Sequence, residues 1–549
     1  MEGFTPWPEE AARQYVARGY WPGVPISDSL DHSVRDGPDR VAVVDDTTSL
    51  TYDELGCQAR RLALALHRTG IRKGDRVIIQ LPNRVEFVIA CYGIIKAGAI
   101  PVMAIPQLRS KEISFLAGLT EAVAIIIPDE YRGFNYPQMV AELRPELPGL
   151  RHVIVAGGGV PPDSLSLDRL LDTPLEKEYP PDLLEGLRPD PNEAAIIYHT
   201  GGTTGLPKAV AHTHNSLWAF TWSFIVNEGW NSDSSTLVCV PAALEAFVRR
   251  ITVCIRAGGK VVLRTGTKAQ DILGAIEKEG LTDLLLPPAL AADLLACPDL
   301  EKYDLSSLRQ VYCGIGPFTA EQVTELRQRL GCASVFRTYG STEGLGLSVR
   351  RDDPPEVNYK YVGRPCCPDD DYRIVDEQGN EVPPEQEGEL IARGPHIVRS
   401  YYRAGKENDQ AFDAQGFFHT GDYAARDERG YIRITGRKKD WIRRGGQTII
   451  PLEVEDLLQS HPKVDKVAVV AMPDPRLGER PCAYVIARPG PALTLEELVE
   501  YLGGKGLARY KLPERLELVT QIPVTSHGKV EKRLLREDIA RKLEAEGNK

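Results

Sequence analysis

The chain has 549 residues, which is too long for a single hydrophobic core and predicts two to four domains. Its 66 basic and 77 acidic residues give a net charge of −11, which argues against a general nucleic-acid binder but not against a small anionic substrate held locally. Ten scattered cysteines form no C-x-x-C pair, so neither a disulfide framework nor a zinc site is indicated.

No segment has the pattern of a membrane span or a secretion signal. Residues 1–21 are acidic and lack an apolar core, and apolar runs such as 87–100 are too short or are interrupted by charge. We therefore expect a soluble, cytoplasmic protein whose partners include neither a membrane nor a nucleic acid.

Short β-branched runs alternate with helical patterns from residue 40 onward. The run 40–46 precedes a helix that opens on the capping box Thr51 to Glu54, and the run 75–81 precedes an amphipathic segment ending at Gly98. Further extended runs follow at 122–129, 150–157, 193–200, 236–243 and 260–266. This rhythm is typical of βαβ units and predicts a large parallel or mixed sheet covered by helices.

The segment HTGGTTGLPKAVAHTH, residues 199–214, predicts a phosphate-binding loop. Glycines let a backbone approach a ligand, hydroxyl and amide N–H groups bind phosphate oxygens, and a lysine neutralises charge. A flexible surface turn is the alternative, and it is disfavoured by the run of small and hydroxylated residues before Lys208. The Walker pattern fails because Ala209 follows that lysine, and G-x-G-x-x-G is absent.

The rest of the chain changes character in two places. Residues 179–191 form a Pro-rich connector, and short strands punctuated by Gly and Pro at 356–436 predict a small β-rich subdomain. After about residue 440, mixed helical and extended patterns predict a compact C-terminal domain.

Four clusters carry further chemistry: YGSTEG at 339–344, FHTGD at 418–422, TGRKKDWIRRGG at 435–446 and IPVTSHGKVEKRLLRE at 522–537. Each has an ordinary explanation by itself. Glu343 could cap a helix, Asp422 could close a hairpin, the basic run could be a solvated face, and Lys529 could simply be exposed.

In this order, and with the loop at 199–208, the clusters resemble the adenylate-forming superfamily of acyl-CoA synthetases, peptide-synthetase adenylation domains and luciferases. The resemblance covers essentially the whole chain. The segments GFTPWPEE, QLPN and YYRAGKEND are most similar to stand-alone aryl-acid activating enzymes such as those for 2,3-dihydroxybenzoate. The resemblance implies a large N-terminal domain of two α/β-sandwich subdomains with a small β-rich subdomain, and a small mobile α+β C-terminal domain. The implied domains are residues 1–438 and 439–549.

The implied chemistry is attack of a carboxylate on the α-phosphate of ATP, where repulsion between two anions is the obstacle. By resemblance, Lys529 neutralises both anions, Thr342 contacts the α-phosphate, and Glu343 binds Mg²⁺, so these three are the catalytic residues and Glu343 the metal ligand. The implied nucleotide-binding residues are Thr200, Gly201, Gly202, Thr203, Thr204, Lys208, Gly314, Tyr339, Gly340, Asp422 and Arg437. Among these, Asp422 is implied to bind the ribose hydroxyls.

The resemblance also implies a hinge at Lys439, about which the C-terminal domain turns so that Lys529 leaves before thioester formation. The implied acid pocket comprises Leu244, Glu245, Gly314, Gly316 and Leu347. In aryl-acid enzymes a His and an Asn stand where this chain has Leu244 and Glu245, which places dihydroxybenzoate or salicylate specificity in doubt.

Two interpretations of Glu245 stay open. Its carboxylate can accept a hydrogen bond from an N–H group on the acid distal to the carboxylate, since an unpaired Glu in an apolar pocket would repel the substrate. Alternatively, it points away and pairs with Arg249 one helical turn later.

The sequence thus predicts an ATP- and Mg²⁺-dependent ligase. It would convert an aromatic or heteroaromatic carboxylic acid to an acyl-adenylate and transfer the acyl group to the phosphopantetheine thiol of a carrier protein. A coenzyme A ligase is the main alternative. Activation of another small oxyacid, such as nitrite, for attack by an aryl amine is a more distant one. A nucleotide-binding regulatory protein is disfavoured, because Lys529 and Glu343 are both present.

Overall fold

The computed structural model describes residues 2–200, 208–266, 268–316, 318–332, 334–444, 447–524 and 530–547. The chain divides into two compact units. Unit 1 comprises Met1–Asn358, Pro365–Asp371 and Ala392–Phe418, and unit 2 comprises Tyr359–Arg364, Tyr372–Ile391 and His419–Lys549. The boundary predicted between residues 438 and 439 lies inside unit 2. The two units describe one conformation of the chain, so they do not test whether residues 439–549 move as a domain.

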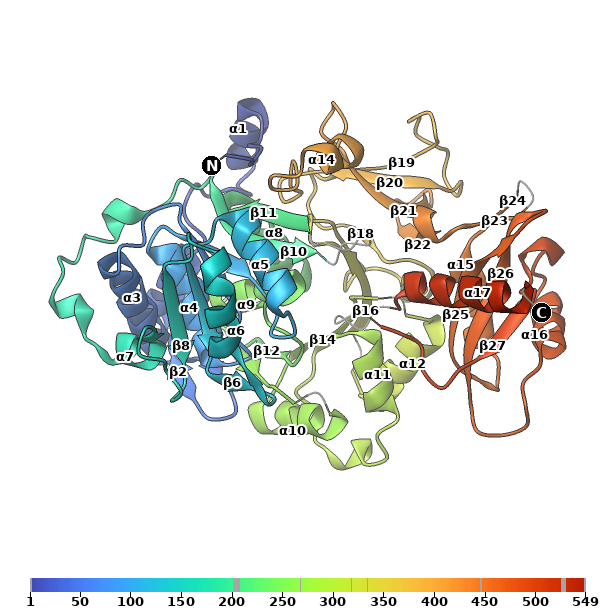
Figure 1. The fold of residues 1–549 in the computed structure, drawn as a ribbon, viewed down its shortest axis with the longest axis horizontal. Coiled ribbons are helices and arrows are strands. Elements are labelled where there is room, and N and C mark those ends of the chain that lie inside the picture. The colour runs from blue at the N-terminus through green and yellow to red at the C-terminus, as the bar shows by residue number, and fades with distance from the viewer. Residues whose placement is uncertain are drawn as a thin grey trace. The chain divides into compact units, whose positions relative to one another are not determined.

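A seven-stranded sheet in unit 1 is parallel except at one edge, where β11 runs antiparallel to β10 (Figure 1). In spatial order its strands are β11 (Lys208–Thr213), β10 (Ala194–Thr200), β4 (Ile100–Met103), β3 (Arg76–Ile79), β5 (Ala124–Pro128), β8 (His152–Ala156) and β9 (Leu165–Ser166). The strands are short. They are rich in Ile and Val because both faces of the sheet are covered.

A second sheet has nine strands and is parallel from β16 to β1. Its order is β18 (Arg364–Pro365), β17 (Gly346–Ser348), β16 (Ser334–Gly340), β15 (Gln310–Cys313), β14 (Asp283–Leu286), β12 (Ser235–Val238), β13 (Lys260–Leu263), β1 (Val41–Val44) and β2 (Ser49–Thr51). Because parallel strands end at the same edge, the segments after β12, β15 and β16 lie together.

Most of the first fourteen helices pack on these sheets, and β6 (Glu130–Tyr131) and β7 (Phe134–Asn135) form a small separate hairpin. The helices are α1 (Glu9–Ala17), α2 (Asp28–Asp36), α3 (Tyr52–Arg68), α4 (Val85–Lys96), α5 (Ser110–Thr120), α6 (Tyr136–Leu143), α7 (Leu167–Asp172), α8 (His214–Glu228), α9 (Glu245–Arg256), α10 (Ala269–Glu279), α11 (Pro288–Leu295), α12 (Ala320–Arg329), α13 (Val357–Lys360) and α14 (Gly405–Ala411). Leu, Ile and Val side chains of α10 to α12 pack on the nine-stranded sheet and form one core.

The predicted β-rich stretch forms a four-stranded sheet in the order β19 (Asp371–Val375), β20 (Gly388–Arg393), β21 (Phe418–Arg426) and β22 (Ile432–Arg437), in which β21 and β22 are antiparallel. A five-stranded sheet in unit 2 contains β24 (Gln447–Ile449), β23 (Ile442–Arg444), β26 (Gly478–Ala487), β25 (Val464–Asp474) and β27 (Arg515–Leu518). Helices α15 (Pro451–Gln459), α16 (Leu495–Gly504) and α17 (Lys532–Gly547) accompany it. Apolar side chains of α15 and α16 form one core with this sheet, and Leu535 and Ile539 of α17 belong to a second core with it.

The local predictions are confirmed, and the prediction of one large sheet is wrong. Thr51 and Glu54 form the capping box of α3, and each extended run between residues 40 and 266 contains a strand. These strands divide between two sheets, because hydrophobic periodicity defines a strand but not its neighbours. The two sandwiches implied by the family resemblance are therefore the correct description.

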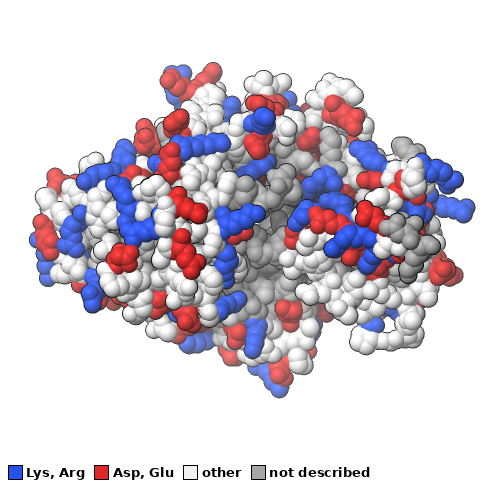
Figure 2. Space-filling model, in the orientation of Figure 1, with Lys and Arg blue, Asp and Glu red and all other residues white. Residues whose placement is uncertain are grey.

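The charged side chains of unit 1 are mixed in sign. On the face of this unit shown in Figure 2, Lys and Arg lie interspersed with Asp and Glu among the described residues, so that face has no extended patch of one sign. Within the described ranges, no helix is both long and apolar enough for a bilayer span.

Candidate active site

The predicted phosphate loop joins the two antiparallel strands at the edge of the seven-stranded sheet. Thr200 ends β10, Lys208 begins β11, and the two residues are paired across the hairpin. Gly201, Gly202, Thr203 and Thr204, which are predicted to contact phosphate, lie outside the described residues. The Lys208 Nζ lies 4.4 Å from the centre of the Tyr401 ring, within the range of a cation–π contact.

The turn that carries Thr342 and Glu343 connects β16 to β17, and no helix begins there. Tyr339 and Gly340, predicted to bind the nucleotide, are the last residues of β16 and pair with Leu347 and Gly346 of β17. The predicted pocket residue Leu347 is 1% exposed, so its side chain belongs to the core.

Two hydrogen bonds hold Glu343, one to its side-chain carboxylate and one to its main-chain carbonyl oxygen. The Tyr401 hydroxyl donates to the Glu343 Oε1 at 2.7 Å, and the Val398 N–H donates to the Glu343 carbonyl oxygen at 2.8 Å. Burial, reinforced by the Glu343 charge, raises the pKa of Tyr401 well above its ordinary value, so this hydroxyl keeps its proton and is the donor. The described residues provide no other hydrogen bond to the Glu343 carboxylate.

The predicted pocket glycines follow β15, at the same sheet edge as the turn after β16. A Cβ at Gly314 would lie 2.5 Å from the Thr338 Oγ1, and one at Gly316 would lie 2.9 Å from the Pro288 Cγ. No side chain fits at Gly314 without displacing Thr338. Because these residues have no side chain, the main chain at this strand end lies close to Thr338 and Pro288. A narrow slot beside a flat ring would require such close packing.

Glu245 is the first residue of α9, and Leu244 is its N-cap. The Glu245 Oε1 lies 2.5 Å from the Arg249 Nε, and both side chains are less than 10% exposed. The Arg249 guanidinium also lies 4.2 Å from the centre of the Phe220 ring. Burial raises the pKa of Glu245 to about 7, although the Arg249 charge opposes this shift.

This geometry matches the second interpretation of Glu245, the pair with Arg249. The hypothesis of an N–H donor on the acid assumed a carboxylate without a counter-charge, and Arg249 supplies that charge. With Arg249 as its partner, Glu245 gives no reason to expect an N–H donor on the acid.

Replacement of Glu245 by leucine should destabilise the protein by about 3 kcal/mol, because it leaves the Arg249 charge buried without its partner. The midpoint of urea unfolding measures this effect. The matched double variant Glu245→Leu with Arg249→Met removes both charges and should recover most of the loss. An unchanged midpoint in the single variant would show that the pair does not hold α9 in place.

The predicted ribose-binding residues lie on neighbouring strands of the four-stranded sheet. Asp422 of β21 is paired in register with Arg437 of β22, and the Arg437 Nε lies 2.7 Å from the Asp422 Oδ1. The Asp422 side chain is 6% exposed. Arg437 therefore fixes the orientation of the Asp422 carboxylate, and the ribose-binding role of Asp422 stays a prediction.

The predicted hinge lies in a short 3₁₀ helix, Lys438–Asp440, directly after β22. Arg536 of α17 donates to the Lys439 carbonyl oxygen at 3.3 Å and contacts the Asp440 carboxylate at 3.2 Å. Lys529, predicted to be the catalytic lysine, lies outside the described residues. The roles of Lys439 and Lys529 remain predictions.

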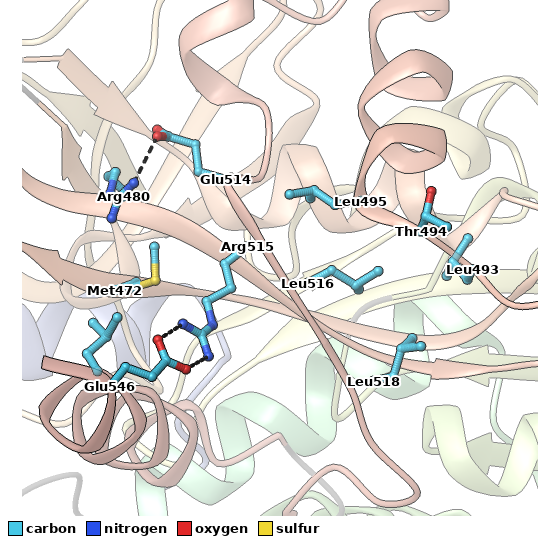
Figure 3. A pocket seen from close by; sticks show the side chains of 11 residues that line it. Met472, Arg480, Leu493, Thr494, Leu495, Glu514, Arg515, Leu516, Leu518 and Glu546 are labelled. Atoms are coloured by element: carbon cyan, nitrogen blue, oxygen red, sulfur yellow. Dashed lines mark hydrogen bonds and ion pairs between the residues drawn. The ribbon is translucent and has the colours of Figure 1, made fainter. Parts of the chain in front are cut away.

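A groove on unit 2 has a mixed lining of apolar and charged side chains. It is lined by leucine side chains of α16 and β27, and two ion pairs cross it, Arg480 with Glu514 and Arg515 with Glu546 (Figure 3). Among the described residues, none of those predicted for the site lines this groove. Both arginines in the lining have carboxylate partners.

Comparison with known proteins establishes the family. Residues 30–402 match the family described as AMP-binding enzyme, and residues 453–529 match the AMP-binding enzyme C-terminal domain. The chain belongs to the AMP-binding enzyme family. The resemblance seen in its motifs is thereby confirmed, and the family is an ATP-dependent adenylating one.

Two relatives of this AMP-binding enzyme match it almost end to end. The 2,3-dihydroxybenzoate-AMP ligase of Bacillus subtilis is 36% identical over 99% of both chains. The salicyl-AMP ligase / salicyl-S-ArCP synthetase of Mycobacterium tuberculosis is 36% identical over 97% of this chain and 94% of its own. The anthranilate CoA ligase AuaEII in complex with anthranoyl-AMP is 25% identical, with a TM-score of 0.86 over 95% of this chain and 98% of its own. The chain is therefore an AMP-forming acid ligase with the predicted α/β fold.

Sequence reasoning did not find Tyr401. It lies 58 residues from Glu343 along the chain, and nothing in its local sequence indicates a contact with that carboxylate. Its segment, YYRAGKEND, served only as a family marker.

Proposed function

We propose that this AMP-binding enzyme activates an aromatic or heteroaromatic carboxylic acid with ATP and transfers the acyl group to the phosphopantetheine thiol of a carrier protein. The observation that carries this proposal is the end-to-end match to ligases whose names specify aryl acids and, in one case, a carrier protein. The family match alone would leave the acid's class open.

The chemistry has two steps. A carboxylate oxygen of the acid attacks the α-phosphorus of ATP, and pyrophosphate leaves. The thiolate of the carrier then attacks the carbonyl carbon of the acyl-adenylate, and AMP leaves. We assign Lys529 to charge neutralisation in the first step, and Thr342 and Lys208 to phosphate binding. Asp422, fixed by Arg437, is assigned to the ribose hydroxyls.

The residues present fit a magnesium ion that binds as a complex with the nucleotide. Mg²⁺ in ATP-dependent enzymes is usually held by one or two carboxylates together with substrate phosphates and water. Glu343 has one carboxylate oxygen bound to Tyr401, which leaves Oε2 as a ligand, and the described residues contain no cluster of three or more metal-binding side chains. When bound, the ion would neutralise the departing pyrophosphate.

A coenzyme A ligase is the second candidate. It is favoured by the similarity to AuaEII, whose name specifies coenzyme A as the acceptor for anthranilate. The acid-activating step is the same in both candidates, so only the thiol distinguishes them.

ATP–pyrophosphate exchange over a panel of benzoates, aminobenzoates, picolinates and cinnamates tests the proposal. We expect exchange with one class of aromatic acid, and no exchange with any acid would contradict the proposed function. Purified carrier protein and coenzyme A should then compete for the acyl-adenylate. Preferred loading of coenzyme A would make the second candidate correct. Exchange with nitrite alone, followed by attack of an aryl amine, would identify the more distant alternative.

A further inference from the structure

Tyr401 contacts two residues with separate predicted roles. Its hydroxyl donates to the Glu343 Oε1 at 2.7 Å, and its ring lies 4.4 Å from the Lys208 Nζ. Glu343 is the proposed metal ligand, and Lys208 belongs to the predicted phosphate loop. All three residues lie in unit 1. Tyr401 therefore contacts both Glu343 and Lys208, the two residues expected to bind the polyphosphate of ATP and its metal ion.

The main chain around Tyr401 is fixed on two sides. The Tyr401 N–H donates to the Asn408 Oδ1 at 2.7 Å, and the Asn408 Nδ2 donates to the Tyr401 carbonyl oxygen at 2.9 Å. The Tyr402 N–H donates to the Ala209 carbonyl oxygen at 2.8 Å, which ties this segment to β11 directly beside Lys208. The Tyr401 ring also packs edge-on against Phe412. Its position is thus defined by α14 and β11 rather than by Glu343.

The turn that carries Glu343 is fixed independently, through its carbonyl groups. His212 contacts the Thr342 carbonyl oxygen through Nε2 at 2.8 Å, and His396 contacts the Gly344 carbonyl oxygen through Nδ1 at 2.7 Å. A carbonyl only accepts, so these ring nitrogens carry the protons. Burial lowers the pKa of His212 to about 4, which keeps that ring neutral. The turn and the Tyr401 main chain are therefore held by separate contacts, and the Tyr401 hydroxyl orients the Glu343 carboxylate.

We propose that Tyr401 is a positioning residue for metal–nucleotide binding: its hydroxyl holds Oε1 of Glu343 so that Oε2 binds the nucleotide's Mg²⁺, while its ring supports Lys208. The inference rests on the proposed function, in which Glu343 is the metal ligand. Partners that orient a metal ligand commonly change metal affinity 10- to 100-fold, roughly, when they are removed.

Tyr401→Phe tests the hydroxyl while it retains the ring beside Lys208. We expect the affinity for Mg²⁺–ATP, measured by calorimetric titration, to fall about 10-fold. The affinity for ATP in EDTA should stay within about twofold of the wild type, because the contact between Lys208 and the ring remains. The Mg²⁺ concentration for half-maximal pyrophosphate exchange should rise to match, with an unchanged KM for the acid.

Tyr402→Phe is the matched control. Tyr402 is the next residue, it is 1% exposed, and its hydroxyl has no hydrogen-bond partner among the described residues. Its replacement by Phe should leave both ATP affinities unchanged. Equal losses in the two Tyr variants, or equal losses with and without Mg²⁺ in Tyr401→Phe, would show a general packing effect and overturn the proposal.

Glu343→Gln separates failure of this inference from failure of the proposed function. If Glu343→Gln retains wild-type Mg²⁺ dependence, Glu343 is not the metal ligand and this inference fails with it, whereas the proposed function fails only if the wild type shows no exchange with any acid. If Glu343→Gln loses Mg²⁺–ATP affinity but Tyr401→Phe does not, only the positioning role is wrong. In the double variant, Tyr401→Phe should add no further loss, because its effect passes through the Glu343 carboxylate.

Discussion

Replacement of Lys529 by alanine should slow acyl-adenylate formation by about three orders of magnitude or more, which corresponds to a barrier raised by about 4 kcal/mol or more. The reason is electrostatic. The acid and the α-phosphate are both anions, and a positive charge between them is needed most in the transition state, where they share one oxygen. Pyrophosphate exchange measures this step.

Thioester formation from supplied acyl-adenylate should largely survive in Lys529→Ala, because the anion repulsion has already been overcome when the adenylate exists. Exposed Lys466 of β25 provides the control, and Lys466→Ala should leave both steps unchanged. Equal losses in the two half-reactions of Lys529→Ala would contradict the assignment of this lysine to adenylation.

Replacement of Lys439 by proline should abolish thioester formation while pyrophosphate exchange stays near normal. Proline restricts φ to about −65° and limits the preceding residue as well, so a turn about this residue would be blocked. We expect the C-terminal domain of this variant to remain in the orientation in which the acyl-adenylate forms. Single-turnover transfer to carrier protein or coenzyme A measures the loss.

Lys439→Ala is the matched control for this variant. It removes the same side chain but leaves φ free, and the contact from Arg536 to the main-chain carbonyl of residue 439 can persist. Both half-reactions should therefore survive. A proline variant with normal overall turnover would exclude Lys439 as the hinge, and loss in Lys439→Ala would assign the effect to the lysine charge instead.

The candidate site residues were located from sequence because they lie in short, local motifs, and their roles stay predictions. Thr200 ends the extended run predicted at 193–200, Glu343 lies on a turn, and Asp422 lies in the predicted β-rich stretch, whereas the sequence did not predict the strand that begins at Lys208. Local hydrogen bonding and backbone preference specify such elements over a few residues. The sequence did not determine the partner of Glu245. The spacing of Glu245 and Arg249 is compatible with an ion pair between them and also with a Glu245 side chain that faces the acid.

The sequence by itself determined the family and the strand runs between residues 40 and 266, and it located the motifs to which we assign phosphate and metal binding, because each depends on residues close together in the chain. Only the tertiary structure decided which strands share a sheet, whether Glu245 pairs with Arg249, and that Tyr401 reaches Glu343 from 58 residues away. The physical reason is that burial and pairing depend on which surfaces the whole chain brings together. A charge or hydroxyl takes the partner that packing places beside it, and hydrophobic periodicity along the chain does not specify that partner.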